Sequence, residues 1–319
     1  MDILLVLYRA REAELKKTLR ALALVRDEFA NLRILVSGPK ADFERVTQQI
    51  RLAGLVSKTC LTHRYDNIGF AGGQNMLLAQ AFGAGATFAL VYNPDLVVAR
   101  GALTALLACA RENKKVGLLG PWIEASYEEQ EGRFFDSRGI GWSRDGRHFD
   151  IGQGRAWVEP PSVTLNRVDG LTGACLLVSR QTYLLVVSKC LEFFDGWFVA
   201  YREDAELGRR CDILGITSSV VSIPGFVHAR GVSGNSRANP LVNSLSVQNR
   251  FFMRFKLRGN RPGNIVFQTV RDAVVAAACL TVERSSLTGL KNAVALRRSA
   301  KYKGQICGVS SKTTSRWRA

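Results

Sequence analysis

The sequence predicts an α/β fold in which a mostly parallel sheet carries helices on both faces. Short apolar runs of strand length alternate with segments of helical spacing through the first 123 residues. The chain has 319 residues, 47% of them hydrophobic, which supports one large domain or two small ones. Its formal net charge of +17 is unevenly placed and indicates a basic extension at the C-terminus.

Hydrophobic spacing and Gly-Pro breaks account for each helix and strand predicted in the first half. Residues 3–8 form a continuous apolar run, and residues 12–24 place Leu15, Leu19 and Leu22 on one helical face. A second strand at 31–39 stops at Gly38-Pro39. The same patterns then predict helices at 42–53, 73–83 and 101–113 and strands at 58–64, 86–92 and 116–121.

The second half is less regular. Residues 124–168 are rich in Gly, Arg, Asp and aromatics, which indicates an irregular or antiparallel insertion. A strand at 173–180, a helix near 181–188, a strand at 220–227 and a helix at 241–257 follow. Residues 264–304 resemble one or two basic amphipathic helices. We therefore expect a domain over 1–258, with halves 1–123 and 124–258, and a basic helical tail over 259–319.

Polar residues follow several predicted strands, at the edge where α/β sheets bind ligands. The strand at 86–92 leads into Asn93-Pro94-Asp95, and a carboxylate there can hold Mg²⁺ or Mn²⁺. A type I turn explains the same residues locally. His228 comes after the strand at 220–227, where a structural role is the simpler local explanation. Gly72 and Gly73 precede a predicted helix, which suits either a phosphate or a plain turn.

The stretch "FFDGWFVAYREDAELGRR" combines aromatics with an acidic pair. Glu203 and Asp204 in a first helical turn are favoured by the helix dipole, and they also suit a general base at an aromatic-lined pocket. Arg209 and Arg210 are candidates for contact with phosphate or for ion pairs with Glu203 and Glu206.

The order and spacing of these motifs resemble the inverting family 2 glycosyltransferases of the GT-A fold, and most closely their rhamnosyltransferase-like branch. The matching stretches are Asn67-Ile68-Gly69-Phe70-Ala71 with Asn75, Asn93-Pro94-Asp95, Gly173-Ala174, Phe194-Asp195 through Glu203-Asp204 to Leu207 and Arg210, and His228 with Gly231 and Ser233. The resemblance covers roughly residues 1–258. It departs where the family places an Asp at the end of the second strand, because Ser37 stands there.

The resemblance implies a role for each of these residues. Asp204 is the expected general base, with Glu203 beside it, and Asp95 with His228 is the expected metal site for Mg²⁺ or Mn²⁺. The expected donor contacts are Tyr8, Arg9, Ser37, Asp66, Asn67, Gly69, Phe70, Gly72, Gly73, Asn75 and Asn93. The expected acceptor contacts are Gly173, Ala174, Trp197 and Tyr201, and Arg209 and Arg210 are expected at phosphate.

The implied reaction is inverting transfer of a sugar, with dTDP-rhamnose favoured as donor over a UDP- or GDP-sugar. The implied acceptor is a glycan or a lipid-linked glycan in cell-surface polysaccharide synthesis. Transfer of this kind uses one base and a divalent ion that neutralises the leaving diphosphate. A nucleotidyltransferase is the less favoured α/β enzyme, because "YRAREAEL" after the first strand has no glycine. A family member acting only as a binding module is disfavoured by the presence of Asp95, Asp204 and His228.

The excess of basic residues indicates which partners and which cellular location to expect. Residues 251–319 hold 14 Lys/Arg against 2 Asp/Glu, a net +12, which favours binding to an anionic membrane surface. A basic nucleic-acid-binding protein is the alternative of another class, but no nucleic-acid recognition motif accompanies the charge. Seven scattered cysteines without a CxxC pair and a start that does not resemble a signal peptide predict a cytoplasmic protein, peripheral at the inner face of the membrane.

Overall fold

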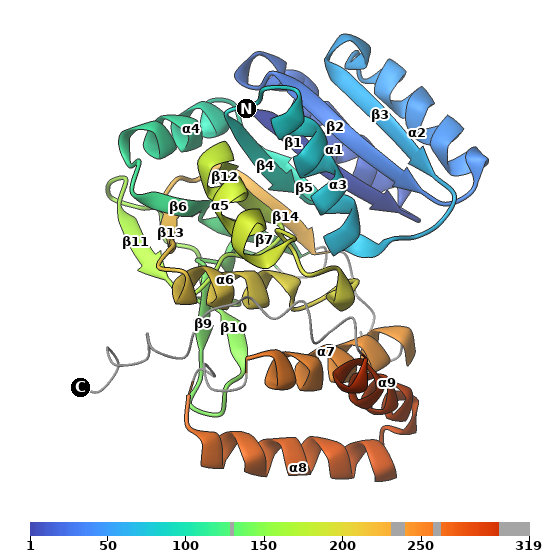
Figure 1. The fold of residues 1–319 in the computed structure, drawn as a ribbon. Helices are drawn as coiled ribbons and strands as arrows, with labels where there is room; N and C mark the ends of the chain where they lie inside the picture. Colours follow the sequence, from blue (N-terminus) through green and yellow to red (C-terminus); the bar gives the residue numbers. More distant parts are fainter. Residues whose placement is uncertain (128–130, 231–239, 258–262, 300–319) are drawn as a thin grey trace.

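The centre of the fold is an eight-stranded sheet with the strand order β11-β13-β6-β12-β4-β1-β2-β3 (Figure 1). The computed structural model describes residues 1–127, 131–230, 240–257 and 263–299. Four neighbouring strands are parallel, as predicted: β1 (Asp2–Tyr8), β2 (Asn31–Ser37), β3 (Thr59–Arg64) and β4 (Phe88–Tyr92).

The other half of the sheet is mixed. β12 (Cys175–Ser179) lies antiparallel between β4 and β6 (Val116–Pro121), while β13 (Thr217–Val221) runs parallel to β6. β11 (Leu165–Val168) closes the edge antiparallel to β13. Because β12 runs against β4, its N-terminal end lies beside the C-terminal end of β4.

Helices cover both faces of the sheet, as the sequence predicts. Leu19 of α1 (Glu12–Leu24), Ile50 of α2 (Lys40–Leu52) and Leu103 of α4 (Ala102–Glu112) belong to the apolar core on one face. On the opposite face the core contains Leu77 of α3 (Gly69–Gly83), Val186 of α5 (Arg180–Cys190) and Leu207 of α6 (Glu203–Ile213). Alternate residues of β1 point into the two cores, as the twofold strand period requires.

α3 begins at Gly69, four residues earlier than predicted, so Gly72 and Gly73 lie inside the helix. A Cβ on Gly73 would lie 2.8 Å from both methyl carbons of Val6. Gly73 is therefore needed for the close approach of α3 to the sheet, and the expectation that the glycine pair precedes the helix is wrong.

The residues between β6 and β11 contain antiparallel structure, as expected. A second sheet has the order β5-β14-β7-β8, formed by β5 (Leu96–Val98), β14 (Phe226–Arg230), β7 (Ile123–Tyr127) and β8 (Phe134–Ser137). β9 (Ile140–Trp142) and β10 (His148–Asp150) form a hairpin.

The strand predicted at 220–227 is in fact parts of two strands, β13 and β14, in different sheets. Pro224 lies in the break between them, where its missing N–H costs no ladder hydrogen bond. His228 consequently lies within β14, paired in register with Leu96 of β5.

The C-terminal helices α7 (Pro240–Lys256), α8 (Ile265–Thr281) and α9 (Leu287–Arg298) form a layer beneath the sheets, and the β9–β10 hairpin extends toward it (Figure 1). The predicted helical extension is confirmed. In the described ranges no single helix has the length and apolar composition to cross a membrane, although α8 together with residues 284–298, bent by 111°, passes that test as a pair. The proposed boundary at 258/259 stays a prediction.

Candidate active site

Asp95 and His228 meet at the junction of the two sheets. His228 Nε2 lies 2.9 Å from Asp95 Oδ1, although 133 positions separate them in sequence. Asp95 follows β4 directly, and antiparallel pairing of β5 with β14 carries His228 beside it. The structure thus brings together the two residues expected to hold a metal.

Asp136 completes this cluster and was missed by sequence reasoning. Its Oδ2 lies 2.8 Å from His228 Nδ1, and the residue is only 1% exposed. Burial alone would lower the pKa of His228, but hydrogen bonds to Asp136 and Asp95 raise it to about 9. Asp136 lies in "RFFDSRG", a segment assigned only to an irregular insertion, so the sequence offered no periodic signal for it.

The cluster fits a divalent ion as a partial coordination shell. Asp95 supplies a carboxylate oxygen and His228 an imidazole nitrogen, while Asp136 orients the ring from its other nitrogen, as carboxylates commonly do for metal-bound histidines. No group of three or more His, Cys, Asp or Glu suited to a metal is found in the residues that the structure describes. Donor phosphates and water would have to complete such a shell.

Asp204 is held at the start of α6 by backbone donors. The N–H of Gly173 donates to Oδ2 at 3.1 Å, and the N–H of Ala205 donates to Oδ1 at 2.7 Å. Burial raises the pKa of Asp204, and these two hydrogen bonds oppose the shift. Ala174 in turn accepts from the N–H of Asn93 at 3.0 Å. The expected base, acceptor strand and donor-side Asn93 are therefore connected through hydrogen bonds.

Glu203 has a different environment from its neighbour. It is 7% exposed, and its Oε2 has no hydrogen-bond partner among the described residues. Burial, and next the charge of Asp204, raise the pKa of Glu203 to about 8. The N–H groups of Gly173 and Ala205 favour the charged form of the Asp204 carboxylate, whereas Oε2 of Glu203 lacks such a donor in the described part of the chain, so Asp204 is the better candidate for the base.

The loop before this pair has a strained backbone. Val199, Tyr201 and Arg202 have φ values of +58°, +70° and +73°, in the left-handed region that a β-branched residue such as Val rarely adopts. Conformations of this kind cost about 1–3 kcal/mol each and persist only where the surroundings impose them. The strain is thus concentrated within five residues of Asp204.

Asn249 of α7 holds this loop and is another residue that sequence reasoning missed. Its Nδ2 lies 2.8 Å from the carbonyl oxygens of Phe198, Ala200 and Tyr201, and the side chain is completely buried. Phe198 also packs on Phe252 of the same helix, with ring centroids 5.0 Å apart. α7 therefore imposes the loop conformation that leads into α6.

The N-terminus of α3 packs on the same loop. Asn67 Oδ1 accepts from the Gly69 N–H at 3.0 Å, and a Cβ on Gly69 would lie 2.4 Å from the Val199 carbonyl oxygen. Phe70 lies against Gly173. Asn75 binds the backbone of Phe194 through both ends of its amide, at 2.7 and 2.9 Å. These predicted donor residues organise the site's walls in this structure.

The other predicted donor residues lie along the ends of β1, β2 and β3. Tyr8 pairs in register with Ser37, and Ser37 with Arg64, which forms an ion pair with the exposed Asp66. Ser37 is 1% exposed and its hydroxyl has no partner among the described residues. Arg9 lies over the Tyr8 ring. These residues therefore gather at one edge, beside α3.

The two arginines expected at phosphate make internal contacts. Arg210 is 4% exposed and donates to Glu206 at 2.7 Å and to the carbonyls of Glu192 and Phe193 at 2.8 Å. Although burial acts to raise it, the charges of Arg210 and Lys256 lower the pKa of Glu206 to about 2. Arg209 forms an ion pair with Asp212. This geometry gives both arginines structural roles and no support to phosphate contact.

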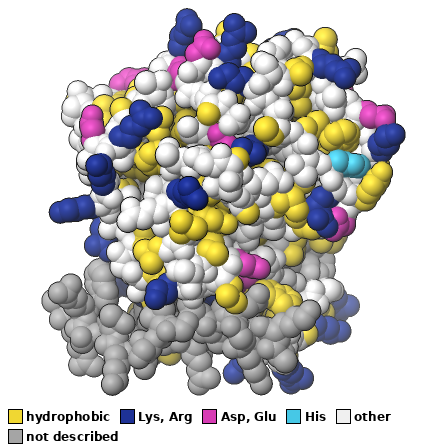
Figure 2. Space-filling model, turned by 45° about the horizontal axis from the view of Figure 1, so that its top comes forward, with side chains coloured by type: hydrophobic (Ala, Val, Ile, Leu, Met, Phe, Trp, Pro, Cys, Tyr) yellow, Lys and Arg dark blue, Asp and Glu magenta, His cyan; other side chains and the backbone are white. Residues whose placement is uncertain are grey.

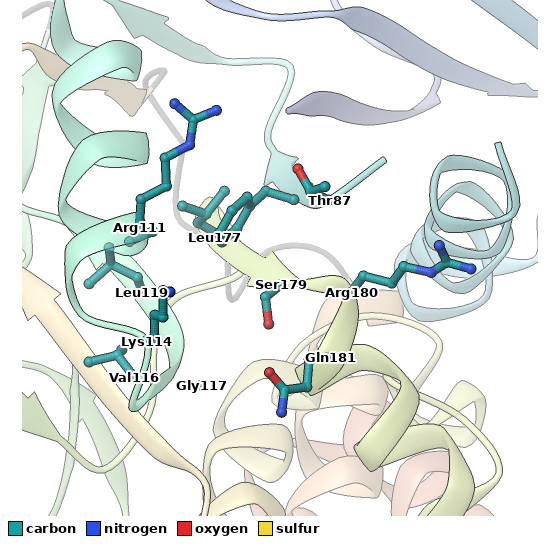
Figure 3. Close-up of a pocket in the computed structure, with 12 residues that line it drawn as sticks. Thr87, Arg111, Lys114, Val116, Gly117, Leu119, Leu177, Ser179, Arg180 and Gln181 are labelled. Atoms are coloured by element: carbon teal, nitrogen blue, oxygen red, sulfur yellow. The ribbon is translucent and has the colours of Figure 1, made fainter. Parts of the chain in front are cut away.

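A cavity of about 350 Å³ lies away from these residues (Figure 3). It is lined at the start of β4 by Thr87 and Phe88 and at the end of β12 by Ser179, at the opposite edge of the sheet from Asn93 and Ala174. Figure 3 shows the side chains of Arg111 and Arg180 extending away from it. None of the predicted site residues contributes to this cavity, so it is not the candidate active site.

Comparison with known proteins agrees with this fold. No family model matches the chain. Over 187 residues it is 29% identical to the N-acetylglucosaminyl-diphospho-decaprenol L-rhamnosyltransferase of Mycobacterium tuberculosis, in strains CDC 1551 / Oshkosh and ATCC 25618 / H37Rv. That match covers 52% of this chain and 57% of the relative. The chain therefore spans a little over half the length of the curated relatives it matches.

Two solved structures share the fold. GalNAc-T7 with UDP, GalNAc and Mn²⁺ superposes with a TM-score of 0.57 at 12% identity, over 85% of this chain and 53% of that one. Residues 1–349 of S. aureus TarS superpose with a TM-score of 0.51 at 13% identity, over 92% and 78% of the two chains. At such low identity these matches establish the fold alone.

The fold places the chain among proteins of the GT-A glycosyltransferase fold. Within that class its sequence is similar to a rhamnosyltransferase, so the predicted resemblance to the rhamnosyltransferase-like branch of family 2 is confirmed. The prediction of a glycosyltransferase enzyme is supported by the same relatives.

Proposed function

We propose that the protein is a metal-dependent inverting glycosyltransferase that moves a sugar, rhamnose as the first choice, from a nucleotide diphosphate to a lipid-linked glycan. The observation that carries the proposal is that the Asp95–His228 pair and the carboxylate of Asp204 belong to one connected site. Asn93, two residues before Asp95, donates to the carbonyl of Ala174, and the neighbouring Gly173 donates to Asp204. One base and one site for the leaving diphosphate are what a single displacement requires.

Asp204 accepts the proton of the acceptor hydroxyl as that oxygen attacks C1 of the sugar and the bond from C1 to the diphosphate breaks. The N–H groups of Gly173 and Ala205 hold the carboxylate in place for this step. A divalent ion held by Asp95 and His228 would supply positive charge to the leaving diphosphate. Attack opposite to the leaving group inverts the anomeric centre.

The choice of substrates rests on the relatives. The curated relatives are named for L-rhamnose transfer to N-acetylglucosaminyl-diphospho-decaprenol, which supports a rhamnose donor and a lipid-linked acceptor here. Asp95, with GalNAc-T7 crystallised with Mn²⁺ and UDP, supports Mg²⁺ or Mn²⁺ use. We place the protein in cell-envelope polysaccharide synthesis at the inner face of the membrane, where such an acceptor is accessible from the cytoplasm.

A panel of nucleotide sugars tests the donor. With Mn²⁺ present, dTDP-rhamnose at one hundred times its Kd should stabilise the folded chain by about 2.7 kcal/mol in thermal unfolding. UDP- and GDP-sugars at the same concentration should stabilise it less. Preference for a UDP-sugar would reassign the donor, and the absence of a shift with any nucleotide sugar would contradict the proposed function.

On the face shown in Figure 2, the arrangement of charge gives no support to the basic nucleic-acid-binding alternative. Over the described part of the face in Figure 2, Lys and Arg side chains are scattered among apolar and polar ones and form no continuous track. Nucleic-acid backbones are usually bound along such tracks.

Asn249→Asp should lower kcat by about 10²-fold, because it removes the donors that fix the loop before Asp204 and small misplacements of catalytic groups are costly. It should also reduce stability by about 1–3 kcal/mol, since three loop carbonyls, the buried one of Phe198 among them, lose their partner. Activity is compared at a temperature where circular dichroism shows both proteins folded.

Asn292→Asp is the matched control, because Asn292 of α9 donates at 3.1 Å to the side chain of Gln248, the residue of α7 that precedes Asn249. It should keep near-normal kcat. A positioning role for Asn249 also requires a changed pH profile of kcat, so loss of stability with an unaltered profile would reduce its role to folding.

A further inference from the structure

α8 presents an uncharged apolar face that is largely exposed in the described structure. The exposed large apolar side chains along this helix are Ile265, Val266, Phe267, Val270, Val274 and Leu280. Val270 and Val274 are 59% and 62% exposed, one helical turn apart. Exposed apolar patches of this kind mark contact with a membrane or a partner.

The charged residues of α8 are turned away from this face. Arg271 and Asp272 are its only charged residues, and both are in ion pairs with the body of the protein. Asp272 pairs with Arg250 and Arg254 of α7, and Arg271 pairs with Asp145 next to β9. Gln268, one turn before Asp272, is 1% exposed and accepts from Arg254. Ion pairs and a hydrogen bond thus hold the polar side of α8 against the rest of the protein, and the apolar side consequently faces solvent.

We propose that α8 lies flat in the surface layer of a membrane and inserts its apolar face among the lipid acyl chains. Its 17 residues extend about 26 Å, which suits a helix lying in the interface. The membrane is favoured over a second copy of the chain because the C-terminal region is also cationic, with 14 Lys/Arg against 2 Asp/Glu over residues 251–319. An apolar helix face within a basic stretch of sequence suits an anionic bilayer.

This inference changes the kind of membrane contact that the sequence predicted. The basic residues predicted attraction by charge, whereas the structure assigns the contact to uncharged side chains of α8. Burial of apolar surface does not weaken in salt, but attraction between exposed charges is screened. Binding should therefore retain a salt-resistant part.

α7 links the proposed membrane-binding helix α8 to the loop before the candidate base. Arg250, which pairs with Asp272 of α8, follows Asn249, whose side chain holds the loop before Asp204. If the proposed function holds, a lipid-linked acceptor would meet Asp204 from the side of the molecule that faces the bilayer.

Vesicle sedimentation of the full chain tests the proposal. Wild type should pellet with vesicles of phosphatidylcholine and 30% phosphatidylglycerol at both 0.1 M and 0.5 M NaCl. Val270→Glu/Val274→Glu should lose about tenfold or more of its vesicle affinity at 0.5 M NaCl, because each exposed valine no longer enters the acyl layer. Arg297→Gln/Arg298→Gln should reduce binding at 0.1 M NaCl only.

The matched control is Val158→Glu/Val163→Glu, which adds the same charges at valines that are 65% and 66% exposed between β10 and β11. It should bind vesicles like wild type. Equal pelleting of the α8 variant and wild type would overturn the proposal, as would complete loss of wild-type binding in 0.5 M NaCl. If wild type were a dimer and the α8 variant a monomer, and both bound vesicles equally, the apolar face of α8 would instead be a contact between two copies of the chain.

Activity assays separate this inference from the proposed function. With a water-soluble acceptor analogue, Val270→Glu/Val274→Glu should turn over like wild type, but turnover should fall with acceptor embedded in vesicles. If wild type bound vesicles normally but had no transferase activity, the proposed function would be refuted, and the proposal that α8 binds the membrane would stand.

Discussion

Asp204→Asn is expected to lower kcat for sugar transfer by about 10²–10⁴-fold, the range in which general bases contribute. Asparagine keeps one oxygen for the Gly173 N–H and loses the bond from the Ala205 N–H, so the start of α6 loses one contact while the donor affinity should change little. The measurement is steady-state kinetics with a nucleotide sugar and a soluble acceptor. Wild-type kcat in the variant would remove Asp204 from the reaction.

The pH profile adds a second readout for Asp204. Burial raises its pKa above the usual range, and the base works only when ionised. Wild-type activity should therefore be kept at higher pH and fall as the pH drops through that raised pKa. The residual activity of Asp204→Asn should lack this acid limb.

Asp212→Asn is the matched control for this substitution. Asp212 lies in the same helix and pairs with Arg167 and Arg209, remote from Gly173. It should retain kcat and the acid limb of wild type. A loss equal to that of Asp204→Asn would mean that any acidic residue of α6 matters only for folding.

Asp95→Ala is expected to abolish the response to metal and to lower activity by about 10³-fold, since a bound ion stabilises charge by several kcal/mol. Wild type should gain thermal stability when Mn²⁺ and a nucleoside diphosphate are added together, and Asp95→Ala should not. This readout does not depend on turnover. Equal stabilisation of both proteins would place the metal elsewhere.

Asp136→Asn should weaken Mn²⁺ binding by about 10–100-fold, as loss of a carboxylate that orients a metal-bound histidine commonly does. Asp27→Ala, which removes an exposed carboxylate outside the site, should leave Mn²⁺ binding unchanged. Isothermal titration with Mn²⁺ and nucleoside diphosphate measures both. Unchanged affinity in Asp136→Asn would limit Asp136 to a structural contact with His228.

Much of the fold of residues 1–123 was predictable because its helices and strands follow from local hydrophobic spacing. The parallel strands β1 to β4 and the helices between them follow from periodicity, and the edge of such a sheet is where ligands bind. Asp95 and Asp204 could be predicted as site residues because each belongs to a compact sequence motif. The start of α3 was misplaced because Gly72 and Gly73 looked like a turn, whereas Val6 requires the absence of a side chain at Gly73.

By itself, the sequence determined the α/β class, the order of the motifs and the basic C-terminal region, since these depend on composition and short-range spacing. Only the tertiary structure decided that Asp136 orients His228 and that Asn249 holds the strained loop, because these contacts join residues 92 and about 50 positions apart. Of the two roles that the sequence left open for Arg210, the structure shows the ion pair with Glu206, in a buried position. Which side chains meet across such separations depends on the packing of whole elements, and no local pattern records that.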